Sequence, residues 1–102
     1  MIQMIEIRKT RTFANWIEQL RDPQAVARVD VRLRRLSLGN PGDAKPVGGG
    51  VSELRINYGP GYRVYFIGHG RTIVVLLCGG DKQTQDRDIQ NAIEMAKEFR
   101  NA

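Results

Sequence analysis

Residues 53–66 read Glu-Leu-Arg-Ile-Asn-Tyr-Gly-Pro-Gly-Tyr-Arg-Val-Tyr-Phe, with apolar residues alternating on both sides of a Gly-Pro-Gly segment. Alternation with a period of two is typical of half-buried strands, and a glycine-rich turn between two such runs predicts a β-hairpin. We expect a three-residue loop at 59–61, because that register gathers the apolar residues on one face. The expected cross-strand pairs are Tyr58–Tyr62, Ile56–Val64 and Leu54–Phe66.

The opposite face of this hairpin carries its two arginines. In the expected register Arg55 lies opposite Tyr65, and Arg63 is the diagonal neighbour of Arg55. Diagonal positions lie about 7–8 Å apart, a spacing at which two guanidinium groups can contact one phosphate. Two arginines so close repel each other, which argues against a purely structural role. The alternative is that Glu53 pairs with Arg55 along the strand and that this face has no further function.

The rest of the chain predicts an α+β protein with a single domain over residues 1–102. Alternation in residues 2–8 predicts a strand, and apolar residues at helical spacing in 13–20 and 26–36 predict a helical hairpin around Asp22-Pro23. Thr10 or Thr12 is expected to cap its first helix. Strands are expected at 43–47, 51–58, 62–68 and 72–78, the last of them central, and Thr84 is expected to cap a final helix. The expected order is β-α-α-β-β-β-β-α.

Composition limits the classes of partner and compartment. A net charge of +5 and an isoelectric point near 9.9 favour an acidic partner such as RNA, DNA, a ribosome or an acidic protein segment. The alternative is a solvated basic surface. The single cysteine, Cys78, excludes an internal disulfide and is expected to pack as an apolar residue. No apolar run approaches the roughly twenty residues of a membrane span, and Glu6 argues against a signal peptide, so we expect a cytoplasmic protein without a membrane partner.

Two lysines lie where they can join the arginines. Lys82 follows Gly79-Gly80-Asp81 at the expected junction of the last strand and the last helix. A helix N-terminus attracts anions, and we expect the glycines to let a ligand approach the backbone. Lys45 lies on the short strand beside Pro46, and the pattern leaves its direction open. Lys45, Arg55, Arg63 and Lys82 are therefore the expected phosphate-binding residues.

The sequence contains no metal-ligand spacing, nucleophilic triad or phosphate-binding loop, so no metal or small-molecule cofactor is expected. His69 lies in an expected turn and is interpreted as a solvated residue. RNA cleavage by its own 2′-hydroxyl can proceed with arginine, lysine and tyrosine alone. Arginines stabilise the phosphorane, and a lysine among other cations can exchange protons. Tyr65 can orient or exchange a proton, or it can simply pack on the arginine stems.

Several motifs occur in an order that resembles a known family. They are Phe13-Ala14-Asn15-Trp16, Leu38-Gly39-Asn40-Pro41-Gly42-Asp43-Ala44-Lys45, Glu53-Leu54-Arg55-Ile56, Gly59-Pro60-Gly61-Tyr62-Arg63-Val64-Tyr65-Phe66 and Leu76-Leu77-Cys78-Gly79-Gly80-Asp81-Lys82-Gln83-Thr84-Gln85. Together they resemble the addiction-module killer proteins of the HigB-like branch of the RelE/ParE type II toxin superfamily. The likeness covers nearly the whole chain.

The resemblance implies a fold, a function and partners. The fold would be the RelE/ParE-like toxin fold, in which a helical hairpin and a C-terminal helix pack on a small twisted, mainly antiparallel sheet. The function would be that of a toxin that cuts mRNA in the ribosomal A site, with a cognate helix-turn-helix antitoxin as its partner. Arg55, Arg63 and Lys82 occupy the positions expected for catalysis. The C-terminal tyrosine or the histidines of some relatives are missing, so the general acid is not assigned.

Three functions are therefore compatible with the sequence. The favoured one is a ribosome-dependent mRNA endonuclease, because cations gathered on a sheet face suit a phosphate substrate. The first alternative is a ParE-like toxin that inhibits DNA gyrase without catalysis, which the same fold allows. The second alternative is a plain RNA-binding module. It is disfavoured because exposed stacking aromatics are missing from the expected strands.

Overall fold

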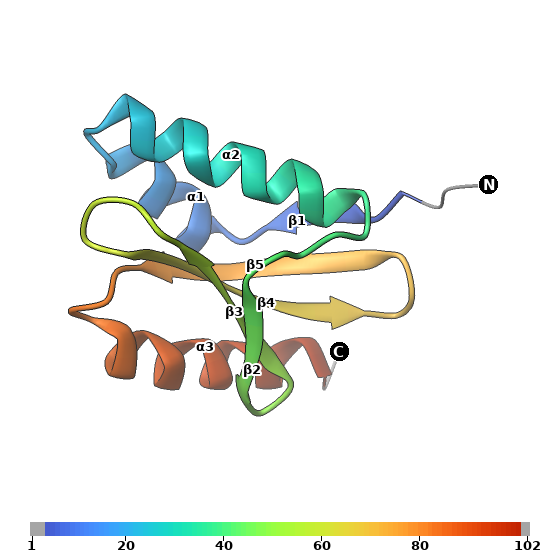
Figure 1. Cartoon of the computed structure of the whole chain (residues 1–102). Helices are drawn as coiled ribbons and strands as arrows, with labels where there is room; N and C mark the ends of the chain where they lie inside the picture. The colour runs from blue at the N-terminus through green and yellow to red at the C-terminus, as the bar shows by residue number, and fades with distance from the viewer. Residues whose placement is uncertain (1–3, 101–102) are drawn as a thin grey trace.

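The computed structural model describes residues 4–100, with only the backbone of Arg100 (Figure 1). Three helices and a five-stranded mixed sheet form an α+β fold in the expected order. The elements are β1 (Glu6–Lys9), α1 (Arg11–Gln19), α2 (Pro23–Ser37), β2 (Ala44–Gly48), β3 (Val51–Ile56), β4 (Tyr62–His69), β5 (Ile73–Gly80) and α3 (Gln85–Arg100). The expected first strand began earlier than β1, and its residues 2–3 lie outside the described residues.

The sheet has the strand order β1-β5-β4-β3-β2. β1 pairs with β5 in parallel, and the other three pairings are antiparallel, so the sheet is mainly antiparallel as expected. β5 lies between β1 and β4 and is buried along most of its length. Its apolar composition follows from this position, because a strand covered on both faces needs apolar side chains on both.

The helices cover the two faces of the sheet and form two cores. α1 and α2 lie on one face and α3 lies on the other (Figure 1). The first core joins Phe13 and Val29 of the helical hairpin to Leu54 and Leu76 of the sheet. The second core packs the alternate residues of β4 and β5 against Ala92 and Ala96 of α3. Because the strand residues alternate between the two cores, each strand position belongs to one side of the molecule.

Local signals in the sequence define the helical hairpin. The Thr10 hydroxyl caps α1 by accepting a hydrogen bond from the Phe13 amide at 3.0 Å, which confirms the first of the two expected caps. The Asp22 carboxylate caps α2 by accepting from the Gln24 amide at 2.9 Å, and Pro23 occupies the first helical turn. Each cap satisfies an amide that the helix itself leaves without a partner.

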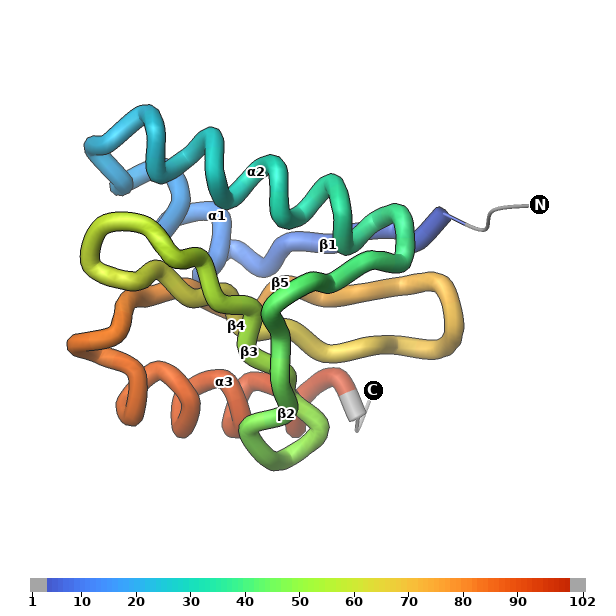
Figure 2. The backbone as a smooth tube through the Cα atoms, viewed as in Figure 1, coloured from blue at the N-terminus to red at the C-terminus, as the bar shows by residue number. Residues whose placement is uncertain are grey.

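The register of the β3–β4 hairpin differs from the expected one. Ile56 pairs with Tyr62 and Arg55 pairs with Arg63, so the loop spans residues 57–61 and the expected three-residue loop was wrong. The cause is Tyr58, whose hydroxyl donates to the Asp22 carboxylate at 2.6 Å and draws Tyr58 out of the strand. Figure 2 shows the loop on the same side of the molecule as the turn between α1 and α2. The shift moves the pairing by two positions, so every side chain keeps its expected face.

Candidate functional site

Arg55 and Arg63 lie directly opposite each other on β3 and β4. This is closer than the diagonal arrangement expected from the sequence, because the longer loop moves Arg63 along its strand. Both side chains lie on the face of the sheet that α3 covers, since Tyr65, two positions after Arg63, belongs to the core beneath α3. The Arg55 side chain is 33% exposed and that of Arg63 is 11% exposed. A ligand therefore reaches Arg55 more easily than Arg63.

A buried carboxylate lies between the two arginines and the core. Glu53 is 0% exposed, and its Oε1 accepts a hydrogen bond from Arg55 Nε at 2.9 Å. Its Oε2 accepts from the Tyr65 hydroxyl at 3.0 Å and from Gln85 Nε2 at 2.8 Å. Arg63 Nε lies 3.8 Å from the same oxygen, too far for a hydrogen bond. Four side chains from three elements thus meet at one carboxylate.

Glu53 is held in its charged form by these contacts. Burial alone would raise the pKa of Glu53, because it penalises the charged form. The hydrogen bonds from Arg55, Gln85 and Tyr65, together with the charge of Arg63, reverse this and lower the pKa below its ordinary value. Glu53 therefore carries a negative charge at neutral pH and offsets one of the two arginine charges. The expected alternative pairing of Glu53 with Arg55 is present, but it forms part of a larger network.

Arg63 is held by the glycine loop. Its NH1 donates to the Gly61 carbonyl oxygen. Gly61 has a φ of 78°, and a Cβ at this position would lie 2.9 Å from Arg63 NH1. The same Cβ would lie 3.5 Å from the Cβ of Lys82, and the Lys82 amide donates to the Pro60 carbonyl oxygen at 3.4 Å. The missing side chain of Gly61 therefore lets the loop, Arg63 and Lys82 come together.

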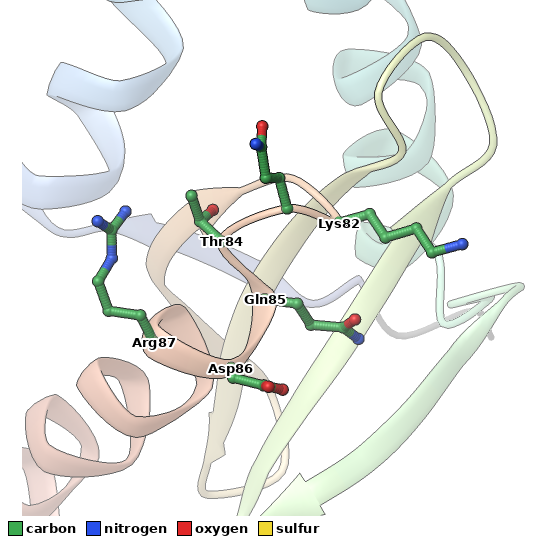
Figure 3. Close-up of a pocket in the computed structure, with 6 residues that line it drawn as sticks. Lys82, Thr84, Gln85, Asp86 and Arg87 are labelled. Carbon is green, nitrogen blue, oxygen red and sulfur yellow. The ribbon is translucent and has the colours of Figure 1, made fainter.

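Lys82 is exposed at the turn that leads into α3, as the sequence predicted for its place in the chain. A shallow pocket of about 450 Å³ lies here, lined by Lys82, Gln83, Thr84, Gln85, Asp86 and Arg87. In Figure 3 the side chains of Lys82, Gln85 and Asp86 extend toward the β3–β4 side of the turn, whereas Arg87 extends the other way. Lys82 and Gln85 therefore face the same side as the arginine hairpin.

One expectation about this turn, that its glycines let a ligand approach, was wrong. Asp81 Oδ1 accepts from the amides of Gln83 at 2.9 Å and of Thr84 at 3.2 Å, so a carboxylate of the chain occupies the two amides that precede α3. The two glycines serve packing instead of ligand approach. A Cβ on Gly79 would lie 2.3 Å from the Trp16 ring, and one on Gly80 would lie 1.9 Å from Asp88 Oδ2. β5 needs glycine at both positions because α1 and α3 press on its two faces.

Tyr65 is fully buried, and its hydroxyl contacts Glu53. Burial, and then the nearby charge of Glu53, raise the pKa of Tyr65 far above its ordinary value. A tyrosine in this setting keeps its proton and orients the carboxylate. The catalytic role expected for Tyr65 stays a prediction, and its position favours an indirect one.

Lys45 lies opposite Glu53 on the edge strand β2 and is exposed. Directly opposed residues share a face of the sheet, so the direction that the sequence left open is now defined. Lys45 belongs to the same face as the two arginines, on the far side of Glu53.

Neither Gln85 as a member of the network nor the complete burial of Glu53 was identified from the sequence. Gln85 comes from the first turn of α3, and its contact with Glu53 spans 32 positions of the sequence. A signal for Glu53 was present, because it alternates with the buried Val51 on the inward face of β3. A carboxylate at such an inward position, beside arginines, indicates a buried ion pair.

Other candidate groups lie apart from this network. Cys78 is buried, as expected for a cysteine that packs as an apolar residue, and burial followed by the charge of Asp88 raises its pKa to about 12. His69 is exposed at the end of β4 and pairs with Ile73, so it belongs to a strand and not to a turn. Within residues 4–100, no group of three His, Cys, Asp or Glu side chains is placed to hold a metal ion. None of the helices in this range is long and apolar enough to cross a membrane.

Similarity to known proteins identifies the family. Residues 15–100 match the family described as phage derived protein Gp49-like (DUF891). A protein of Haemophilus influenzae, described as an uncharacterized protein, is 48% identical over 95 residues, which make up 93% of this chain and 96% of that protein. The HigB-like branch and the RelE/ParE-like fold stay predictions. The family match covers most of the chain, including the whole arginine network, and this protein therefore belongs to the Gp49-like family, a toxin-like family of addiction modules.

Proposed function

We propose that this protein is the toxin of a bacterial type II toxin–antitoxin module and acts as a ribosome-dependent mRNA endonuclease. The observation that carries the proposal is the direct opposition of Arg55 and Arg63 over the shared carboxylate of Glu53. Two arginines with one counter-charge keep a net positive charge on this face. That charge suits an anionic group with the size and geometry of a phosphate.

The arginines keep donors for a ligand. Within the described residues, the side chain of Arg55 hydrogen-bonds to the protein through Nε alone, so its two terminal nitrogens remain for a phosphate. Arg63 uses NH1 for the Gly61 carbonyl oxygen and keeps NH2. In this proposal Glu53, Tyr65 and Gln85 position the guanidinium groups. Because these contacts exist before the ligand arrives, little reorganisation is needed on binding.

The proposed reaction is attack of an RNA 2′-hydroxyl on the adjacent phosphorus. The 2′-hydroxyl gives its proton to water, the new bond joins the 2′-oxygen to phosphorus, and the bond from phosphorus to the 5′-oxygen breaks. The products are a 2′,3′-cyclic phosphate and a free 5′-hydroxyl. Arg55 and Arg63 stabilise the charge on the phosphorane. Lys82 is the proposed partner for the proton that the 5′-oxygen gains, because it is exposed on the same side as the hairpin. Lys45 is the proposed contact for a neighbouring phosphate.

Primer extension on mRNA tests the proposal directly. Wild-type protein, added to a translation reaction with purified ribosomes, should produce cuts confined to translated frames, with 5′-hydroxyl ends downstream of each cut. Arg63→Ala should produce none. Intact mRNA together with trapped gyrase–DNA complexes would contradict the endonuclease function and support non-catalytic inhibition of gyrase instead.

A further inference from the structure

A basic groove that the arginine network does not use lies between α2 and the end of β3. The groove has a volume of about 550 Å³ and is lined by Gln24, Ala27, Arg28, Val31, Arg32, Arg35, Ile56 and Asn57. Six of these residues recur along α2 at helical spacing, so they form one continuous stripe. From Gln24 to Arg35 the stripe is about 17 Å long at the rise of an α-helix. No other element lies above α2 in Figure 1.

The charge of this groove has one sign. Its lining holds three arginines and no carboxylate, and Asp30, the acidic residue of α2, is not among the lining residues. The centre of the stripe is apolar, because Val31 is 49% exposed and Ala27 is exposed beside it. A stripe with an apolar centre and basic flanks complements an amphipathic helix with an apolar stripe and acidic flanks.

The arginines of the groove favour a protein over RNA as its occupant. Arg32 donates to three backbone carbonyl oxygens, those of Arg55, Pro41 and Asp43, and so braces α2 against the sheet. Arg28 lies 4.6 Å from the centre of the Tyr58 ring. Arg35 remains exposed. RNA binders present rows of free cations with exposed stacking aromatics, whereas this groove offers one free arginine, two engaged ones and an apolar centre.

We propose that this groove binds an acidic amphipathic helix of the cognate antitoxin. The inference rests on the proposed toxin function, since that function supplies the partner. α2 packs on the sheet face opposite to the side chains of Arg55 and Arg63, so a helix in the groove does not contact them. The groove therefore anchors the antitoxin, and the arginine face stays open unless a second segment of the antitoxin covers it.

Three variants of the full-length chain test the groove. Arg35→Glu reverses the free charge, Val31→Glu places a carboxylate at the apolar centre, and Arg34→Glu is the matched control. Arg34 is exposed in the same helical turn as Arg35 but does not line the groove. The affinity for the antitoxin encoded beside the gene should fall about tenfold or more in the first two variants and little in the control. Growth arrest without antitoxin should be unchanged in all three.

The outcomes separate the groove from the function. Equal loss of affinity in Arg34→Glu and Arg35→Glu would replace docking by a general charge effect and overturn the proposal. Unchanged antitoxin affinity, with weaker binding of a single-stranded oligouridine to Arg35→Glu, would reassign the groove to RNA. Antitoxin binding that depends on the groove, in a protein that cuts no mRNA, would support the groove while overturning the endonuclease. A wild-type chain that binds no co-encoded protein would overturn both the groove proposal and the toxin–antitoxin module, while mRNA cleavage would still be decided by primer extension.

Discussion

Glu53 and Gln85 are joined by a hydrogen bond of 2.8 Å between β3 of the sheet and the first turn of α3. This contact makes the arginine network depend on how α3 packs, because the hydrogen bond from Gln85 offsets part of the free-energy cost of burying the Glu53 carboxylate. The hairpin alone would supply the arginines, but it would not hold their counter-charge in place. The network is thus a property of the whole fold.

Arg63→Ala and Lys82→Ala should each abolish growth arrest when the protein is expressed without its antitoxin. Each change removes a cation from the proposed phosphate site, and a single charged donor in such a site contributes about 3 kcal/mol to the reaction barrier. The measurement is colony formation after induction, together with antitoxin affinity. Arg71→Ala is the control, because Arg71 is an exposed arginine in the turn at the other end of β4. Full toxicity in both site variants would remove the catalytic interpretation.

Glu53→Gln should lower the free energy of unfolding by about 3 kcal/mol at neutral pH, since it leaves two arginines beside a neutral group. Denaturant titration measures this change. Glu94→Gln is the matched control, because Glu94 is exposed and, among the described residues, pairs with Lys97 alone on the surface of α3. An exposed pair of this kind contributes about 0–1 kcal/mol. A similar loss in both variants would show that the Glu53 network does not stabilise the fold.

Wild-type protein and Glu53→Gln should also differ in how their stability depends on pH. The pKa of Glu53 is lower in the folded protein than its ordinary value of 4.5, so the folded state binds fewer protons than the unfolded chain in this range. The stabilisation is present above that value and is lost as the pH falls through the lower pKa of the folded state. Wild-type protein should therefore lose more stability than Glu53→Gln on acidification. The pKa of Asp22 is also lowered, by its hydrogen bond from Tyr58, but Asp22 contributes equally to both proteins. Parallel pH profiles would contradict the network.

Much of the fold was predictable because its signals are local. The caps at Thr10 and Asp22, the apolar run of β5 and the alternation in β3 and β4 are each read within a few residues. The hairpin register was not predictable in this way. It depends on the hydrogen bond of Tyr58 to Asp22, which joins residues 36 positions apart.

In the candidate site, too, the features with local sequence signals were predictable and those made by contacts between distant elements were not. Arg55 and Arg63 lie on the face where the alternation of the strands places them, and Lys82 lies in the expected turn before α3. Their positions were therefore predictable, while their role in binding phosphate stays a prediction. The burial of Glu53 and the contact from Gln85 arise only when α3 covers the sheet. The role of Gly79 and Gly80 was misread for the same reason, since Trp16 and Asp88 approach them from other elements.

Gly61→Ala should reduce both stability and toxicity, whereas Gly70→Ala should reduce stability alone. Both glycines have positive φ, 78° and 70°, so both variants carry a backbone cost of about 1–2 kcal/mol. At Gly61 the new methyl group would also lie 2.9 Å from Arg63 NH1, while at Gly70 nothing lies within 4 Å. Unfolding titrations and growth assays on the two variants separate the backbone effect from displacement of Arg63. If Gly61→Ala and Gly70→Ala are equally stable and equally toxic, the position of Arg63 is not critical for toxicity.

Cys78 should resist thiol reagents in the folded protein. Its pKa of about 12 leaves almost no thiolate at neutral pH, and its side chain lies in the core beneath α3. Labelling followed by mass spectrometry should be slow in buffer and rapid in denaturant. Rapid labelling of the native protein would mean that α3 opens readily, and the network through Gln85 would open with it.

The parallel pairing of β1 with β5 joins residues 6–9 to residues 73–76, and the Thr10 hydroxyl donates to the Leu77 carbonyl oxygen across 67 positions of the sequence. β5 contributes residues to both cores, so neither core is complete until that strand has left the ribosome. A nascent chain, or a fragment released before residue 73, lacks the strand on which α1 and α3 pack. The arginine face therefore forms only after β5 and α3 have been synthesised, so no folded site exists while those segments are still being made.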